Sequence, residues 1–296
     1  MTSAIQSLVL ASGERETLPV PFKTYESFQA RLVRWSLLGI GLAFFTLVLF
    51  LPLLAIFSEA LKKGWEAYSQ AIIDEEAMAA LRLSLSLLAV SVPLNTIFGL
   101  AAAWTISKFE FRGKRLLVTL VDLPLAVSPV IAGLVFVLLF GSQGWWGDWL
   151  SARGIKVLFA FPSMALATTF ITVPFVVKQL LPLMEAQGTE EEEAAALLGA
   201  GGWQSFWHVT LPNIRWALFH GIVLCTARGI GEFGAVSVVS GHIRGLTNSL
   251  PLHIEILYNE YHFVSAYAVA SLLAAFSLIT LGLKLYFERK TQESSR

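Results

Sequence analysis

The sequence predicts an all-α protein that crosses a membrane six times and leaves no room for a sizeable soluble domain. Of its 296 residues, 55% are hydrophobic and only 14% are charged, whereas soluble domains carry roughly 25% charged residues. The mean hydropathy is +0.66, and several apolar runs reach the ~20 residues that an α-helix needs to span a bilayer. Together these observations place the chain in the membrane class.

Composition also excludes several kinds of function. The 21 basic and 21 acidic residues balance, so no cationic face for nucleic acid is expected. The single cysteine, Cys225, lies in an apolar run, which excludes a disulfide framework and a cysteine-based zinc site. The five histidines do not have the spacing of metal ligands. We therefore expect no metal or cofactor bound by this chain and no catalytic residues in it.

The first 35 residues are expected to form a cytoplasmic segment ahead of the membrane domain. They are polar, and the first apolar run begins only at Ser36 and is too long for a signal peptide, so we expect an uncleaved first span. Between Phe22 and Trp35, apolar residues recur at three- and four-residue steps with charged residues between them. This pattern fits a helix lying in the membrane interface. The alternative is a disordered tail with scattered aromatic residues.

Six apolar segments follow and define a transmembrane domain at 36–287, after which 288–296 form a cytoplasmic tail. The expected spans are 36–57, 83–106, 116–140, 158–181, 215–239 and 264–286. Several contain proline, which membrane helices tolerate where their neighbours satisfy the freed carbonyl groups. Proline kinks a helix, and a bundle of kinked helices is more typical of a transporter than of a simple anchor.

The distribution of Lys and Arg predicts that both termini are cytoplasmic. The N-terminal segment, the connection between spans two and three, and the C-terminal segment hold four each, and the region around the connection between spans four and five holds two. The three connections on the opposite side hold two, two and one. This 14 to 5 asymmetry agrees with an even number of spans. The outward loop at 58–82 is acidic.

The connection between spans four and five differs from every other connection in the chain. Thr189 and Glu192 have the spacing of a capping box, and the glutamates at 190–193 lie at the positive end of the helix dipole. Strong helix formers continue to Leu198. Gly199 and the glycines at 201–202 are then expected to end the helix and turn the chain.

An aromatic segment follows this turn and leads into the fifth span. Trp203, Phe206 and Trp207 give it an apolar face suited to the membrane interface. Leu211 and Pro212 open the next helix, where proline is favoured in the first turn. From physical chemistry alone the connection is either an ordinary amphipathic connector or a site for a partner.

The spacing of this connection resembles the EAA loop of ABC-importer permeases, whose pattern is EAA-x3-G-x9-I-x-LP. One departure, valine for isoleucine, is conservative. In that family the loop forms a coupling helix that docks into a groove of the ATPase subunit, so the resemblance implies an ATPase-docking element at about 185–212. The matching residues are Glu193, Ala194, Ala195, Gly199, Val209, Leu211 and Pro212.

Four further stretches resemble the W-type permease subunits of bacterial sulfate/thiosulfate ABC importers. They are DLPLAVSPVIAGLVFVLLFGSQG from Asp122, ITVPFVVKQLLPLM from Ile171, RGIGEFGAVSVVSGHIRG from Arg228 and SLPLHIEILYN from Ser249. The similarity runs from about Trp35 to about Tyr286. It implies the type I ABC importer permease fold, in a non-catalytic subunit of the bacterial inner membrane that forms the translocation pathway.

The resemblance also implies the partners. They are a related T-type permease, two copies of an ABC ATPase that binds ATP-Mg, and a periplasmic sulfate/thiosulfate-binding protein. The chain itself has no G-x-x-x-x-G-K-[ST] motif, so we do not expect it to bind ATP through a P-loop. The alternatives are a permease for another oxyanion such as molybdate, the T-type sister permease, or an integral-membrane enzyme. An enzyme would need convergent acid, base or metal groups, which are not seen in this sequence.

Two charges within the fifth span are candidates for the translocation pathway or its gate. Arg228 and Glu232 are four residues apart, which on one helix would put them on one face. Arg228 lies about 20 Å along the span from Arg215. Charges inside membranes usually face a bundle interior or a water path. Three roles are open: Arg228 helps an anion pass while Glu232 holds it, or the pair closes the outer gate, or the pair only fixes helix packing.

Part of this segment also matches a motif that has another meaning in soluble proteins. Residues 229–234 fit G-x-G-x-x-G, the dinucleotide fingerprint, but that motif requires a strand before it and a helix after it. Here it lies in an apolar membrane segment. We therefore expect its glycines to admit a closely packed neighbouring helix.

Three other polar residues complete the set of candidates. Asp122 is near the inner end of the third span, and its partner is expected to be a cation on a neighbouring helix or on the second permease. Ser128 and Asn95 could offer hydrogen bonds to sulfate, but isolated polar residues in membrane helices more often join helices to one another. We include Ser128 and Asp122 with Arg228 and Glu232 as candidate pathway or gate residues.

Overall fold

The computed structural model describes residues 28–294, and every regular element within that range is a helix. The chain divides into two compact units, Met1–Pro52 and Leu53–Arg296. The first contains α2 (Phe28–Phe45), the π-helical turn η1 (Thr46–Phe50) and the start of α3 (Leu51–Ala60). The most apolar 18-residue window of 31–60 contains no buried residue. Of the interfacial helix expected at 22–35, residues 22–27 lie outside the described range, and residues 28–35 belong to α2.

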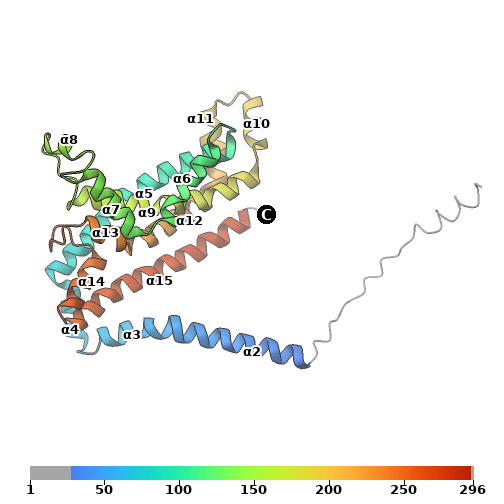
Figure 1. Cartoon of the computed structure of the whole chain (residues 1–296). Helices are drawn as coiled ribbons and strands as arrows, with labels where there is room; N and C mark the ends of the chain where they lie inside the picture. The colour runs from blue at the N-terminus through green and yellow to red at the C-terminus, as the bar shows by residue number, and fades with distance from the viewer. Residues whose placement is uncertain (1–27, 295–296) are drawn as a thin grey trace, which may run out of the picture. The chain divides into compact units, whose positions relative to one another are not determined.

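The second unit is a bundle built on four long helices. Its elements are α4 (Trp65–Ile73), α5 (Glu75–Lys108), α6 (Lys114–Ala126), α7 (Pro129–Phe140), α8 (Gly147–Ser151), α9 (Phe161–Gln187), α10 (Glu190–Leu197), α11 (Gly202–Ser205), η2 (Phe206–Thr210), α12 (Leu211–Ile230), α13 (Gly234–Val239), α14 (Leu250–Asn259) and α15 (Phe263–Ser294). Helices α5, α9 and α12 pack on one another, and α15 packs on α12. Figure 1 shows α10 and α11 at one end of this bundle and α4 and α14 at the other.

Within residues 28–294, four helices are long and apolar enough to cross a membrane: 31–60, 75–108, 161–187 and 263–291. A fifth span is present if α6 and α7, which meet at 109°, cross together. The segment expected as one span at 116–140 is therefore bent sharply at Ser128. Ser128 adopts an extended ψ of 134°, because the ring of the following Pro129 disfavours helical geometry at the residue before it. The segment expected at 215–239 is also divided, into α12 and α13.

The second span begins at Glu75, earlier than the apolar run suggests. The carboxylate of Asp74 accepts hydrogen bonds from the backbone N–H groups of Glu76 (3.1 Å) and Ala77 (3.3 Å), which caps the helix N-terminus. The helix then continues for 34 residues to Lys108, a length of about 51 Å at 1.5 Å per residue. One unbroken helix therefore joins the two ends of the bundle.

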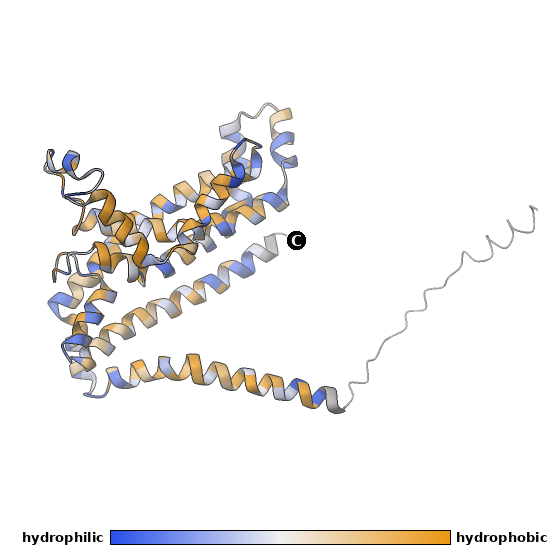
Figure 2. Ribbon diagram, in the orientation of Figure 1, coloured by the Kyte–Doolittle hydropathy of each residue, from blue (hydrophilic) through white to orange (hydrophobic). Residues whose placement is uncertain are grey.

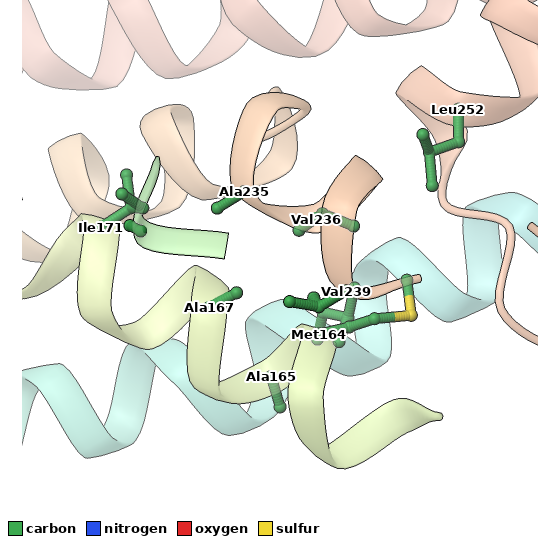
Figure 3. Packing of buried hydrophobic residues seen from close by; sticks show 10 residues of the cluster. Met164, Ala165, Ala167, Ile171, Ala235, Val236, Val239 and Leu252 are labelled. Carbon is green, nitrogen blue, oxygen red and sulfur yellow. The ribbon is translucent and has the colours of Figure 1, made fainter. Parts of the chain in front are cut away.

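Small and β-branched side chains form the core around α9, as Figure 3 shows. Met164 and Ala167 of α9 lie among Ala235 and Val236 of α13 and Leu252 of α14. Small residues allow membrane helices to approach closely. This packing fixes α13, the element that directly follows the candidate residue Glu232.

The buried Asn95 joins two helices, as expected for an isolated polar residue in a span. Its amide Nδ2 donates to the carbonyl oxygen of Thr169 (3.1 Å) and to Oγ1 of Thr172 (2.6 Å). Both acceptors belong to α9, while Asn95 belongs to α5. Asn95 is therefore a contact between helices in this structure.

Candidate functional site

The connection between α9 and α12 contains a short helix that ends in a left-handed turn. Gly199 has φ +91°, as expected for a glycine just beyond a helix end. Its N–H donates to the carbonyl oxygen of Ala196 (3.0 Å), and the N–H of Ala200 donates to that of Ala195 (3.0 Å). These two bonds form a Schellman motif, which satisfies carbonyl groups that the helix leaves unpaired.

Two leucines stand exposed at this turn. The side chains of Leu197 and Leu198 are 90% and 91% exposed, although burying a leucine is worth about 1.5–3 kcal/mol. Figure 2 shows hydrophobic residues along the long helices, whereas α10 begins with four hydrophilic glutamates. The two exposed leucines therefore follow a strongly acidic first turn. Adjacent apolar side chains in a polar rim are typical of a protein interaction site.

The EAA-like residues lie on both sides of the turn. Glu193 and Ala194 are exposed on α10, and Ala195 is half-buried. The carboxylate of Glu193 accepts a hydrogen bond from Oγ1 of Thr189 at 2.7 Å. The remaining matching residues enter α12: Val209 and Leu211 are half-buried, and Pro212 is exposed in the first turn.

The capping box expected between Thr189 and Glu192 is wrong. The Thr189 side chain makes no capping bond, and the Glu192 carboxylate instead lies 2.8 Å from Nζ of Lys108 and accepts from Oγ1 of Thr210 at 3.0 Å. The ammonium group of Lys108 carries a full positive charge, so it attracts the carboxylate more strongly than the backbone N–H group of the expected capping bond would. Burial raises the pKa of Glu192, but the hydrogen bonds from Lys108 and Thr210 outweigh this effect and keep that pKa below its ordinary value.

A second polar contact joins α10 to α12, and an aromatic contact joins the loop to α5. The Glu191 carboxylate accepts a hydrogen bond from Nδ2 of Asn213. Phe206 is buried, with its ring centroid 5.1 Å from that of Trp104 on α5. The other two members of the expected aromatic face, Trp203 and Trp207, are exposed. The aromatic segment therefore turns one ring toward the protein and two rings outward.

The Arg228–Glu232 pair is present, but not on one helix face as expected. Helix α12 ends at Ile230, so Glu232 lies in the break before α13. Nη1 of Arg228 is 2.7 Å from Oε2 of Glu232, which makes the two side chains an ion pair. This carboxylate oxygen accepts no hydrogen bond among the described residues. The other carboxylate oxygen accepts from the N–H of Ala235 at 3.0 Å. The Glu232 side chain is 1% exposed and that of Arg228 is 36% exposed.

The two helix breaks lie against each other. A Cβ atom at Gly234 would be 2.9 Å from Cβ of Pro129, so the start of α13 approaches the start of α7 as closely as glycine permits. Ser128, which is exposed, directly precedes Pro129. A Cβ at Gly229 would be 2.7 Å from Leu88 of α5, whereas a Cβ at Gly231 would meet no atom within 4 Å. The expectation that glycines of the 229–234 run admit close neighbours therefore holds for Gly229 and Gly234 but not for Gly231.

Asp122 lies apart from these residues. Its carboxylate is 3.1 Å from Nζ of Lys178 on α9, and both side chains are about half exposed. The pair lines a cavity of about 270 Å³ between α6 and α9. Of the two alternatives for the partner of Asp122, a cation on a neighbouring helix or one on the second permease, the structure shows the first. No feature of the sequence assigned Lys108 a role in the site. A lysine at the cytoplasmic end of a membrane helix is already expected from the general excess of Lys and Arg in cytoplasmic connections.

Comparisons with known proteins agree with this architecture. The family model described as "Binding-protein-dependent transport system inner membrane component" matches residues 95–293. The sulfate transport system permease protein CysW of Escherichia coli (strain K12) is 46% identical over 274 residues, which cover 93% of this chain and 94% of that protein. The sulfate transport system permease protein CysT of the same strain is 38% identical over 244 residues, covering 82% and 88%.

The fold also matches solved structures. One chain in the crystal structure of a bacterial alginate ABC transporter, in complex with an alginate pentasaccharide-bound periplasmic protein, has a TM-score of 0.74 at 17% identity and covers 91% of this chain and 97% of its own. That likeness concerns the fold alone. The chain belongs to the family of binding-protein-dependent transport system inner membrane components, multi-pass proteins of the inner membrane.

Proposed function

We propose that the chain is the W-type permease subunit of an ATP-driven importer for sulfate or thiosulfate. The identity of 46% to CysW against 38% to CysT favours the W-type over the T-type assignment. The observation that carries the proposal is the loop at 185–212. Its helix α10 has no buried residue and ends in a left-handed turn beside two exposed leucines. This geometry suits a docking element for another protein better than a simple connector.

In the proposed mechanism this subunit is not catalytic. Two copies of a partner ATPase bind ATP-Mg and close on each other, and the docked loops of this chain and of a T-type permease move with them. The helix bundles then alternate between states open to either side, and a periplasmic binding protein delivers the anion. Differential contacts in the two states must supply the coupling free energy.

We propose that the two adjacent helix breaks contribute to the anion pathway or its gate. Irregular backbone at membrane depth is tolerated where it is buried in protein or lines a cavity. Transporters commonly direct the N-termini of broken helices toward anionic substrates. Ser128 and Arg228 are accessible at the breaks, while Glu232 is buried beside Arg228. Asp122, paired with Lys178, lies four residues before the end of α6 and would act on the inner side of the break.

The proposed topology has six spans and cytoplasmic termini. The 14 to 5 asymmetry of Lys and Arg supports it. A reporter that is active only in the periplasm should be silent when fused after Arg296 and active when inserted at Gly64, an exposed turn residue before α4. Silence at Gly64 together with activity after Arg296 would contradict the topology.

The substrate is tested by complementation. In a strain that lacks its own sulfate permeases, expression of this chain with its partner genes should restore growth on sulfate as the sulfur source. A parallel strain without molybdate uptake should not regain molybdate-dependent enzyme activity. Restoration of the molybdate-dependent activity alone would assign the chain to another oxyanion.

A further inference from the structure

The final residue of α5 is bound into the loop that we propose to dock the ATPase. The Lys108 side chain is only 8% exposed, and its Nζ lies 2.8 Å from the Glu192 carboxylate. The same ammonium group donates a hydrogen bond to the carbonyl oxygen of Gly188, the residue that ends α9. Lys108 therefore contacts the loop both just before α10 and in its first turn.

Apolar packing between α10 and α5 is weak. Helix α10 packs on η2 and α11 rather than on α5. A cavity of about 290 Å³ lies between the loop and the end of α5, with Trp104, Phe109, Ala196 and Phe206 among its lining residues. Since interiors normally resist movement because they are closely packed, this cavity leaves α10 room to shift. The Lys108–Glu192 ion pair then links α10 directly to α5.

The N-terminal end of α5 is also held by polar contacts. Near its first residue, the Glu76 carboxylate accepts a hydrogen bond from Nη1 of Arg244 at 2.9 Å, and Arg244 also pairs with Glu260 after α14. Farther along, Oγ of Ser84 accepts from the N–H of Leu250 at 2.8 Å. One continuous helix therefore contacts the α10 loop at one end and the 244–260 region at the other.

We propose that Lys108 is a positioning residue that transmits displacement of the α10 loop to α5 through its ion pair with Glu192. The inference rests on the proposed function, because it needs an ATPase that moves this loop. When the loop shifts, this partly buried ion pair favours movement of both partners together, because separating them would leave the ammonium group of Lys108, whose side chain is 8% exposed, without its carboxylate. Without Lys108, α10 would move into the cavity while α5 stays in place with Trp104 packed on Phe206.

The test uses the complete transporter in liposomes, with ATP supplied to the ATPase side and sulfate-loaded binding protein on the other. Sulfate uptake and ATP hydrolysis are measured together, and bound ATPase is quantified. For Lys108→Ala we expect the ATPase to stay bound and to hydrolyse ATP. The sulfate imported per ATP should fall about tenfold or more, within the range of typical coupling effects.

Two variants control for structural damage. Lys108→Arg keeps a cation and its donors and should stay near the wild-type ratio. Lys114→Ala removes an ion pair to Glu110 (2.6 Å) in the neighbouring connection, which does not involve the α10 loop, and should also leave the ratio unchanged. The charge-exchanged double variant Lys108→Glu with Glu192→Lys should recover part of the ratio.

The outcomes separate this inference from the proposed function. A Lys108→Ala transporter with bound ATPase and a wild-type ratio would overturn the transmission role and leave the proposed function intact. Loss of the ATPase from that variant would mean that Lys108 only shapes the docking surface, which would also overturn the role. Failure of the wild-type complex to import sulfate with ATP would overturn the proposed function and this inference with it.

Discussion

Gly199→Asp should leave the chain in the membrane at normal amounts, while the ATPase is lost on purification and sulfate uptake disappears. Gly199 has φ +91°, a conformation that costs residues with a side chain roughly 1 kcal/mol or more. A Cβ at this position meets no atom within 4 Å, so the strain is in the backbone and no collision is involved. The added carboxylate would also lie near the C-terminus of α10, where the helix dipole disfavours anions.

Two matched variants separate the effect of the position from the effect of the substituted residue type. Gly154 also has positive φ (+67°) and open space around it, but it lies in the connection between α8 and α9. Gly154→Asp should therefore keep the ATPase bound and leave uptake near wild type. Gly199→Asn adopts the left-handed conformation about as readily as Gly199→Asp but adds no charge, so it should retain more activity than the aspartate variant. A Gly199→Asp protein that binds the ATPase and transports at the wild-type rate would reduce the loop to an ordinary connector.

Arg228→Ala is expected to abolish sulfate uptake while lowering the amount of assembled complex much less. The change leaves the Glu232 carboxylate, 1% exposed, without its ion-pair partner. Breaking a fully buried pair costs about 3–5 kcal/mol, and the cost here should be smaller because Arg228 is 36% exposed. Uptake per assembled complex is the quantity to measure, with initial rates normalised to the complex recovered.

A double variant separates the pathway role from the packing role. Arg228→Met with Glu232→Gln removes both charges, and the glutamine oxygen still accepts from the N–H of Ala235. If the pair serves the pathway or its gate, this variant should regain normal amounts of complex but not uptake. Recovery of uptake along with abundance would show that the pair only fixes packing.

The turn in the 185–212 loop could be predicted from sequence because its chemistry is local. A glycine directly after a run of helix formers is sufficient to predict the left-handed turn at Gly199, and the spacing of the loop is a property of adjacent residues. The partner of Glu192 could not be predicted, because Lys108 is distant along the chain and only the packing of α5 beside the loop brings them together. The local capping partner was therefore the wrong choice.

The positions of the two helix breaks could not be predicted from the hydrophobic pattern of the sequence either. Pro93 lies inside the continuous helix α5, and Pro174 and Pro182 lie inside α9, whereas Pro129 begins a new helix. The same residue type has both outcomes because neighbouring helices decide whether the freed carbonyl groups are satisfied. The apolar character of 116–140 and 215–239 was correctly recognised, but their division at Ser128 and beyond Ile230 required the tertiary structure.

The most direct test of the central claim is purification of the affinity-tagged chain in mild detergent, with mass-spectrometric identification and quantification of every chain that accompanies it. We expect an ABC ATPase and one related permease in the wild-type preparation, and loss of the ATPase alone in the Gly199→Asp preparation. Recovery of the intact wild-type chain from native membranes with neither an ATPase nor a second permease would contradict the account.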